Sequence, residues 1–253
     1  MLNFTLPFTL DEWRGHRRYR FVVNGCPAWL VEPEQPDKAG RWVWCMEFPD
    51  AFVERCGAPE LLARGYWYAH VSVGNTFGCP RAQETFRLFH AYVTQVLGLS
   101  RRAVLVGISR GGLYAFRFAA ANPGLVSVVY GDAPVCDFTS WPAGRGVGVG
   151  SPADWRKLLG DYGFASEEEA LSYRGNPVDL AGELHANGVA VVCVVGDADE
   201  AVPYEENTAV LERRLAELGQ RVTVFHKPGC GHHPHGLEDA APVVEFIVAH
   251  NGG

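Results

Sequence analysis

The amino-acid sequence predicts an α/β fold in which a mainly parallel, eight-stranded sheet carries helices on both faces. Short apolar runs rich in β-branched residues alternate with segments of helical periodicity along most of the 253 residues, which is typical of such a sheet. Hydrophobic residues make up 47% of the chain and charged residues 20%. This composition supplies the core of one large domain, so we predict a single domain over residues 1–253.

Eight segments have the composition of strands. They are expected at 18–23, 27–32, 41–47, 66–73, 103–108, 126–131, 189–195 and 221–226. The first two are separated by a turn at Asn24-Gly25, a dipeptide favoured in two-residue hairpins, so they should form an antiparallel hairpin at the edge of the sheet. Apolar residues recur at helical spacing at 80–97, 110–121, 204–219 and 241–250, and these segments are predicted to be helices.

Residues 135–186 interrupt the alternation. They begin with the turn-rich stretch SWPAGRGVGVGSPADW and continue with two short amphipathic segments near 152–160 and 166–174. This connection is longer than a simple crossover between strands. We predict a small cap insertion at the carboxyl ends of the strands, where open α/β sheets bind ligands. A long crossover with a surface loop is the alternative.

Charge and hydropathy exclude several classes of protein. The net charge is −7 and no basic run exceeds a pair such as Arg17-Arg18, so nucleic-acid binding is not expected. No apolar segment is long enough to span a membrane, and the N-terminal positive charges follow the apolar stretch, the wrong order for a signal peptide. Seven cysteines without a C-x-x-C pair fit reduced thiols, and a cytoplasmic location is expected.

One short motif carries the strongest chemical signal. Gly107-Ile108-Ser109-Arg110-Gly111 fits G-x-S-x-G and lies between an apolar strand and a helical run. A serine reaches a carbonyl when its hydroxyl projects from a sharp strand-to-helix turn, and glycines at 107 and 111 let the turned chain pass close to itself. The start of the helix adds a positive dipole beside the reacting oxygen. Ser109 is therefore the predicted nucleophile.

A carboxylate follows in the order that a catalytic triad allows. The run VAVVCVVGDADEAVPY reads as a buried strand that ends in an acidic turn, and Asp199 in this turn is the predicted acid. Asp197 and Glu200 are local alternatives, although turn and helix-start chemistry also explains them. Asp132, which directly follows another predicted strand, is a further alternative.

The base is expected on the loop after the last strand, in RVTVFHKPGCGHHPHG. His232 directly follows a glycine that lets an imidazole turn toward the serine, so it is the predicted base. His233 is the second choice, and His235 is expected to brace the loop through hydrogen bonds. His226 is expected to lie on the strand itself.

The same histidines offer a competing interpretation as a metal site. His232, His233 and His235 supply three imidazoles. Adjacent residues of an extended loop point in opposite directions, and no H-E-x-x-H motif or cysteine pair accompanies them. We therefore predict no metal and no cofactor.

An acyl transfer also requires an oxyanion hole. One donor is expected to be the backbone N–H of Arg110, and the other the backbone N–H of Glu47 or Phe48, after the third predicted strand. The Arg110 side chain has three possible roles. It assists the oxyanion, binds a substrate carboxylate, or forms an ion pair with an acidic residue of the insertion.

These segments together resemble the α/β-hydrolase superfamily along nearly the whole chain. The elbow at 107–111, the GDADEAVP turn at 196–203 and the G-H pair at 231–232 carry the resemblance. The S-R-G-G, DAPVCDFTSWP and GHHPHG segments look like uncharacterised bacterial hydrolases associated with carbohydrate esters, and the S-R step is similar to glucuronoyl esterases.

The resemblance implies a serine esterase that acts through an acyl-enzyme on a small-molecule or carbohydrate-linked ester. A peptidase or thioesterase on the same triad and a non-catalytic ligand-binding protein are the alternatives. Phe138 and Trp141, at the start of the insertion, are predicted to line the substrate pocket, because sugars stack on aromatic faces. Core packing is the alternative role. The oligomeric state is not predicted.

Overall fold

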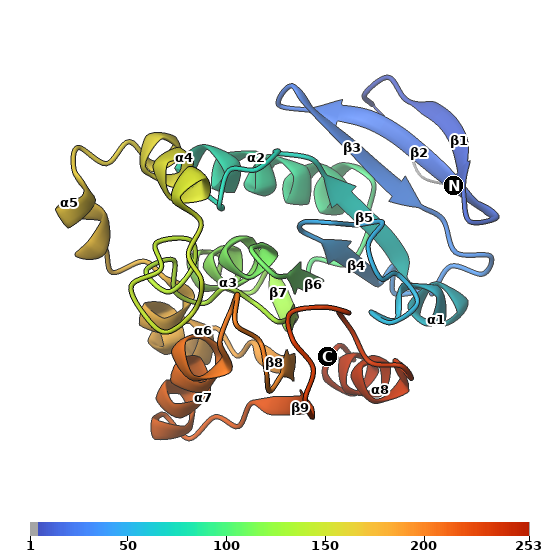
Figure 1. Ribbon diagram of the computed structural model, residues 1–253. Helices are drawn as coiled ribbons and strands as arrows, with labels where there is room; N and C mark the ends of the chain where they lie inside the picture. The colour runs from blue at the N-terminus through green and yellow to red at the C-terminus, as the bar shows by residue number, and fades with distance from the viewer. Residues whose placement is uncertain (1–4, 253) are drawn as a thin grey trace.

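A computed structural model describes residues 5–252, and across this range it has one nine-stranded sheet between two layers of helices (Figure 1). The strand order is β1-β2-β3-β5-β4-β6-β7-β8-β9. The strands are β1 (Thr9–Trp13), β2 (His16–Val23), β3 (Cys26–Val31), β4 (Trp42–Cys45), β5 (Trp67–Val71), β6 (Ala103–Ile108), β7 (Val126–Asp132), β8 (Ala190–Gly196) and β9 (Thr223–Lys227). From β5 to β9 in the sheet all pairs are parallel, which confirms the mainly parallel sheet.

The antiparallel end of the sheet differs from the expectation in one respect. β2 and β3 form the predicted hairpin, with φ of 50° at Asn24 and 74° at Gly25. However, β1 pairs with β2 on the outside, so the sheet has nine strands and the hairpin lies one strand in from the edge. Four of the five residues of β1 are exposed, and a strand without a buried face shows no apolar alternation in its sequence.

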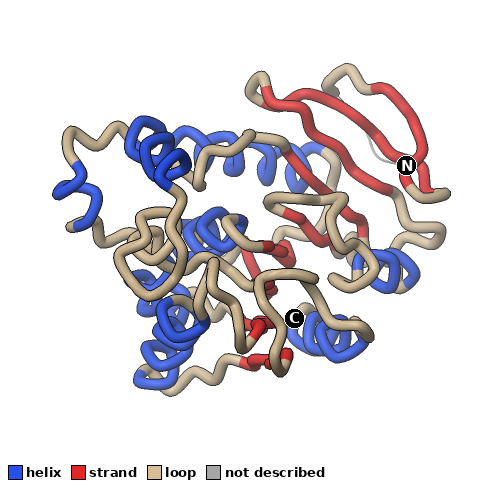
Figure 2. Tube along the Cα trace, viewed as in Figure 1, coloured by secondary structure: helices blue, strands red, loops and turns tan. Residues whose placement is uncertain are grey.

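Helices cover both faces of the sheet, as predicted (Figure 2). The helices α2 (Pro80–Ala91), α3 (Gly111–Ala121), α6 (Ala181–Ala186) and α7 (Thr208–Glu217) bury one face, and α1 (Ala58–Ala63) and α8 (Ala241–His250) bury the other. Successive residues of β6 face opposite layers: Leu105 packs with the first group of helices and Val104 with the second. Among the helices of residues 5–252, none is both long and apolar enough to cross a bilayer.

The long connection between β7 and β8 contains the two predicted helices, here α4 (Pro152–Tyr162) and α5 (Glu167–Leu171). A 3₁₀ turn at Pro177–Leu180 then leads into α6. The connection is fastened to α3, because Arg117 donates hydrogen bonds to the hydroxyls of Tyr162 and Tyr173, the latter at 2.7 Å.

The strand order sets where the site lies. β4 is flanked by β5 on one side and by β6 on the other, so the chain direction across the sheet reverses at this point. Ligands in open α/β sheets bind at such switch points, outside the carboxyl ends of the strands. The loops that follow β4, β6, β8 and β9 all leave from this edge, and they carry every residue predicted for the triad and the oxyanion hole.

Candidate active site

Ser109 occupies a strained turn between β6 and α3. Its φ is 51°, the left-handed region that non-glycine residues seldom adopt, and its N–H is held at 2.8 Å by the carbonyl of Asp132. The flanking glycines are required by close packing. A Cβ at Gly107 would lie 2.7 Å from the carbonyl oxygen of Gly111, and one at Gly112 would lie 2.7 Å from Pro134 Cβ. The turn therefore projects the serine hydroxyl from the edge of the sheet.

Ser109, His232 and Asp199 form a continuous chain of hydrogen bonds. Ser109 Oγ lies 2.9 Å from His232 Nε2, and His232 Nδ1 lies 2.7 Å from Asp199 Oδ2. The other oxygen of Asp199 accepts the N–H groups of Ala201 and Val202, each at 2.9 Å. Three residues from three separate loops are thus brought into the arrangement that a serine triad needs.

The electrostatics favour an ionised Asp199. Its side chain is 1% exposed, and burial by itself would raise its pKa. The hydrogen bond from His232 and those from the N–H groups of Val202 and Ala201 outweigh burial, so the pKa lies below its ordinary value. The carboxylate then accepts the Nδ1 proton of His232 and leaves the Nε2 lone pair directed at Ser109.

The alternative acids Asp197 and Asp132 are paired with histidines other than His232. Asp197 pairs at 2.8 Å with the exposed ring of His226. Asp132 is completely buried, and its Oδ1 lies 2.7 Å from Nδ1 of His235. Its Oδ2 accepts the hydroxyl of Tyr130 at 2.5 Å and the N–H of Gly236 at 2.8 Å. Asp132 therefore holds the predicted loop-bracing histidine and not the histidine beside Ser109.

Glu200 takes part in the turn through its main chain. Its carbonyl accepts the N–H of Val149 at 2.8 Å and its side chain is exposed. This contact joins the glycine-rich stretch of the β7–β8 connection to the loop that carries Asp199.

The predicted oxyanion donors lie on neighbouring strands. Arg110 follows β6, while Glu47 and Phe48 follow β4, and the two strands are hydrogen-bonded to each other. Phe48 has a φ of 56°. Within residues 5–252, no acceptor takes the N–H of Arg110, of Glu47 or of Phe48. The N–H of Arg110 and those of both candidates after β4 are thus left for a ligand atom, as an oxyanion hole requires.

The Arg110 side chain forms an ion pair, but not with the insertion. Its Nη2 lies 2.9 Å from Glu47 Oε1, and its guanidinium carbon lies 4.8 Å from the centre of the Phe48 ring. Burial raises the pKa of Glu47, and the charge and hydrogen bond of Arg110 oppose that rise only in part. The expectation that Arg110 pairs with an acidic residue of the insertion is therefore wrong. Because β4 and β6 are adjacent, the loops that follow them meet and bring Glu47 to Arg110. The ion pair joins the two segments that carry the oxyanion donors.

No model of a known protein family matches the chain, and no curated protein matches it in sequence. Solved structures, in contrast, match nearly all of it. A truncated carbohydrate esterase from gut microbiota superposes with a TM-score of 0.68 at 17% identity, covering 89% of this chain and 91% of its own. Dipeptidyl peptidase 4 of Porphyromonas gingivalis gives 0.66 at 15% identity, with coverages of 97% and 36%. A Pyrococcus furiosus esterase gives 0.62 at 14% identity, with coverages of 98% and 100%.

The chain has the α/β-hydrolase fold. It spans between 35% and 40% of the length of three peptidases that it also matches. At these identities the likeness concerns the fold. The hydrogen-bonded residues described above occupy loops at the carboxyl edge of the parallel strands, where α/β folds bind their ligands.

Of the two aromatic residues predicted to line a pocket, Phe138 does not. It is completely buried, stacks on Tyr173 at 5.4 Å and meets the edge of Tyr162 at 5.6 Å. It offers no surface to a substrate, because it forms the aromatic core under the β7–β8 connection of this α/β-hydrolase fold. Trp141 is half-buried and packs against Phe77 at 6.1 Å.

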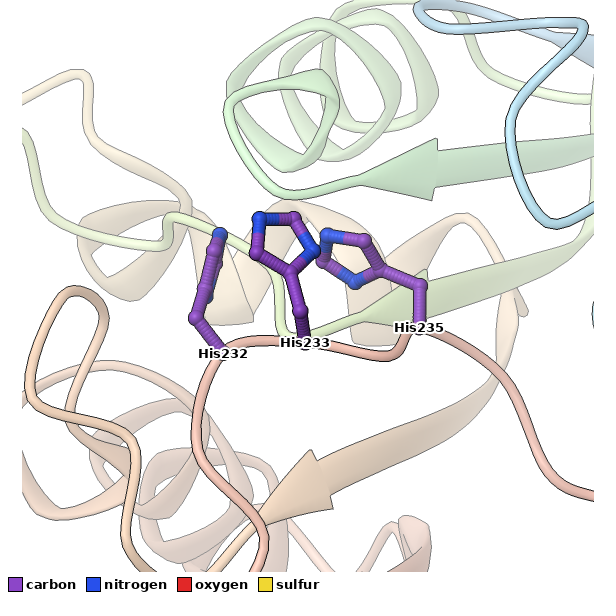
Figure 3. Close-up of side chains that lie close together, drawn as sticks. All are labelled: His232, His233 and His235. Carbon is purple, nitrogen blue, oxygen red and sulfur yellow. The ribbon is translucent and has the colours of Figure 1, made fainter.

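The three histidines of the loop after β9 form one cluster (Figure 3). One ring nitrogen from each of His232, His233 and His235 lies within 4.8 Å of those of the other two. The expectation that neighbouring rings diverge is wrong here, because residues 231–236 form a series of bends and not an extended strand. In this geometry His233 contacts neither Ser109 nor Asp199; its ring is exposed and lies parallel to Phe52.

Sequence reasoning missed Asn207, which organises the loop after β7. The side chain is 1% exposed, and its oxygen accepts the N–H of Cys136 at 2.9 Å and that of Asp137 at 3.1 Å. Its amide donates to Ser140 Oγ at 3.1 Å. An asparagine directly before α7 reads as a helix cap, and the sequence gives no sign of partners some seventy positions away.

Proposed function

We propose that the protein is a serine hydrolase that cleaves a carboxylic ester through an acyl-enzyme. The single observation that carries the proposal is the unbroken hydrogen-bond chain from Ser109 through His232 to Asp199, built on a serine with left-handed backbone. A serine hydroxyl is a weak nucleophile until an adjacent base takes its proton, and this base needs a carboxylate to set its tautomer.

Each residue of the chain has a defined task in this reaction. Ser109 Oγ attacks the ester carbonyl as its proton passes to Nε2 of His232, and Asp199 stabilises the imidazolium. The N–H of Arg110 and that of Glu47 or Phe48 donate to the developing oxyanion. His232 then protonates the leaving alcohol, and the acyl group stays on Ser109. Water, deprotonated by the same imidazole, releases the acid and restores the serine.

A carbohydrate-linked ester is the proposed substrate class. Two observations support it. The carbohydrate esterase matches this chain over 91% of its own length, whereas the dipeptidyl peptidase does so over only 36%. In addition, Trp141 is only partly buried at the start of the β7–β8 connection, and aromatic faces stack against sugars. A peptidase on the same triad is the second candidate, since peptidases share the fold.

We also infer that residues 135–186 act as a cap over the site. The support is their attachment on two sides. Arg117 of α3 holds Tyr162 and Tyr173, and the N–H of Val149 is bonded to the carbonyl of Glu200, beside the proposed acid. These attachments to the nucleophile's helix and to the acid's loop support the inference that the segment shapes the entrance for a substrate.

The test combines covalent labelling with a substrate panel. A fluorophosphonate should label Ser109 stoichiometrically, and aryl esters should turn over steadily. Acetylated, feruloylated and uronate-esterified sugars, with aminoacyl amides and thioesters beside them, then define the substrate class. Ser109→Ala is the matched control, and it should lower turnover by several orders of magnitude with an unchanged circular dichroism spectrum. Labelling without turnover of any substrate would indicate a binding protein on this fold.

A further inference from the structure

The histidine cluster has the layout of a metal site. The ring centroids of His232, His233 and His235 are separated by 5.1, 4.9 and 4.8 Å, and the converging nitrogens lie within 4.8 Å of one another. Tetrahedral zinc with bonds of about 2.0–2.1 Å holds its ligand nitrogens about 3.3 Å apart. Closing the site requires the nitrogens to approach one another by about 1.5 Å at most, and of the three rings that of His233 is exposed (Figure 3).

Two of the three rings are already oriented by carboxylates. Asp199 lies 2.7 Å from Nδ1 of His232, and Asp132 lies 2.7 Å from Nδ1 of His235. Each carboxylate accepts an Nδ1 proton and leaves Nε2 as the nitrogen that is available to a metal. Carboxylate–histidine pairs of this kind orient imidazole ligands at metal centres and raise their basicity. This observation is independent of the spacing of the rings.

His233 completes the set from the solvent side. Its ring is exposed and is stacked on Phe52 at 5.8 Å with an interplanar angle of 19°. Neither of its nitrogens is hydrogen-bonded to any group in the described part of the chain, residues 5–252. An ion therefore meets the ring of His233 first, because His235 is buried behind it.

Charged groups of both signs surround the cluster. Asp132 and Asp199 contribute two carboxylates behind the rings. The buried ammonium of Lys227 is close by and donates to the carbonyl of Pro234, in the same loop. Arg55 also donates to the carbonyls of His235 and Gly236, at 2.8 and 3.2 Å, so two cations balance the two carboxylates and the attraction for an ion comes from the imidazole nitrogens.

We propose that these three histidines bind a borderline transition-metal dication such as Zn²⁺ and that the bound ion inhibits the enzyme. The lone pair of His232 Nε2 cannot coordinate a metal and accept the proton of Ser109 Oγ, which lies 2.9 Å away. The bound ion thus occupies the lone pair that His232 needs to act as the base, and it does so without contact with the substrate. Imidazole ligands favour Zn²⁺, Ni²⁺ and Cu²⁺ over Mg²⁺ and Ca²⁺. Inhibition rests on the proposed function, whereas binding of the metal does not.

The experiment compares wild type with His233→Gln and a matched control, His226→Gln. His226 is another exposed histidine, bonded to Asp197 and outside the cluster. Zn²⁺ affinity is measured by competition with a chromogenic chelator, and inhibition by ester turnover at graded free Zn²⁺. Wild type and His226→Gln should bind one Zn²⁺, lose turnover as it binds and recover fully on chelation. His233→Gln should keep its turnover and bind Zn²⁺ at least about tenfold more weakly.

The two readouts separate the possible failures. If no ester is turned over but wild type still binds Zn²⁺ more tightly than His233→Gln, the proposed function fails and the metal site stands. If His233→Gln binds Zn²⁺ as tightly as wild type, or is inhibited at the same free concentration, the cluster is not the site. Inhibition by Mg²⁺ equal to that by Zn²⁺ would also overturn the assignment, because imidazoles do not select a hard ion.

Discussion

Two aspartate–histidine pairs lie side by side at the edge of the sheet, and a paired substitution distinguishes their roles. Asp199 contacts His232, and Asp132 contacts His235, each at 2.7 Å. In Asp199→Asn, the new amide presents an N–H to His232 Nδ1, so the proton moves to Nε2 and the ring can no longer accept from Ser109. A triad altered in this way loses about 10⁴-fold in kcat, or roughly 5 kcal/mol of transition-state stabilisation.

Asp132→Asn should act on stability instead. Asp132 is completely buried and accepts hydrogen bonds from His235, Tyr130 and Gly236. Breaking a buried network by replacing one partner costs about 3–5 kcal/mol. We take about 3 kcal/mol, since one oxygen remains, and at about 2–4 °C per kcal/mol the melting temperature should fall by roughly 6–12 °C.

The assay is steady-state hydrolysis of an aryl ester at 25 °C, together with a thermal melt of both variants. Asp199→Asn should lose about 10⁴-fold in kcat, and its melting temperature should also fall, because its own buried hydrogen bonds are weakened. Asp132→Asn should melt early and keep kcat within about tenfold of wild type, well short of the loss expected from a triad residue. Collapse of kcat in Asp132→Asn with an unchanged melt, or normal kcat in Asp199→Asn, would refute the assignment of the acid.

Three further predictions follow from the same contacts. Arg110→Ala should lower the free energy of unfolding by about 2 kcal/mol, because it leaves the carboxylate of Glu47 buried without its hydrogen-bond partner, and adding Glu47→Gln should recover most of that loss in a thermal melt. A drop in kcat/KM confined to uronate esters would instead assign Arg110 to substrate. Phe138→Ala should cost about 3–5 kcal/mol, whereas Trp141→Ala should mainly raise KM for sugar esters; a kinetic effect without destabilisation in Phe138→Ala would contradict its burial. Because the pKa of Asp199 is lowered on folding, its ionised form stabilises the fold above pH about 4. The difference in unfolding free energy between wild type and Asp199→Asn, measured by urea titration, should be constant near neutral pH and shrink as the pH falls below 4. A difference that grows in acid would contradict a lowered pKa of Asp199.

The sequence by itself determined the features whose physical causes are local. A strand, a sharp turn and a helix are contiguous around Ser109, so the glycines at 107 and 111 reveal the elbow. The same holds for the acidic turn at Asp199 and the glycine before His232, each directly after an apolar run that marks its strand. Their order along the chain is also a property of the sequence. The α/β class and eight of the strands followed from apolar periodicity, and β1 was missed because an exposed edge strand has none.

Only the tertiary structure decided which side chains meet. Asp132 ends β7 and Asp199 lies in the turn after β8, both near a loop with several histidines, and the pairing depends on the separation of β7, β8 and β9 across the sheet. The partner of Arg110 is Glu47 because β4 lies beside β6, a neighbour relation that crosses some sixty residues of chain. Phe138 is buried because the aromatic rings of Tyr162 and Tyr173 close over it. In each case the stabilising contact joins segments that are distant in the sequence. The local sequence does not show which of these segments the fold brings together.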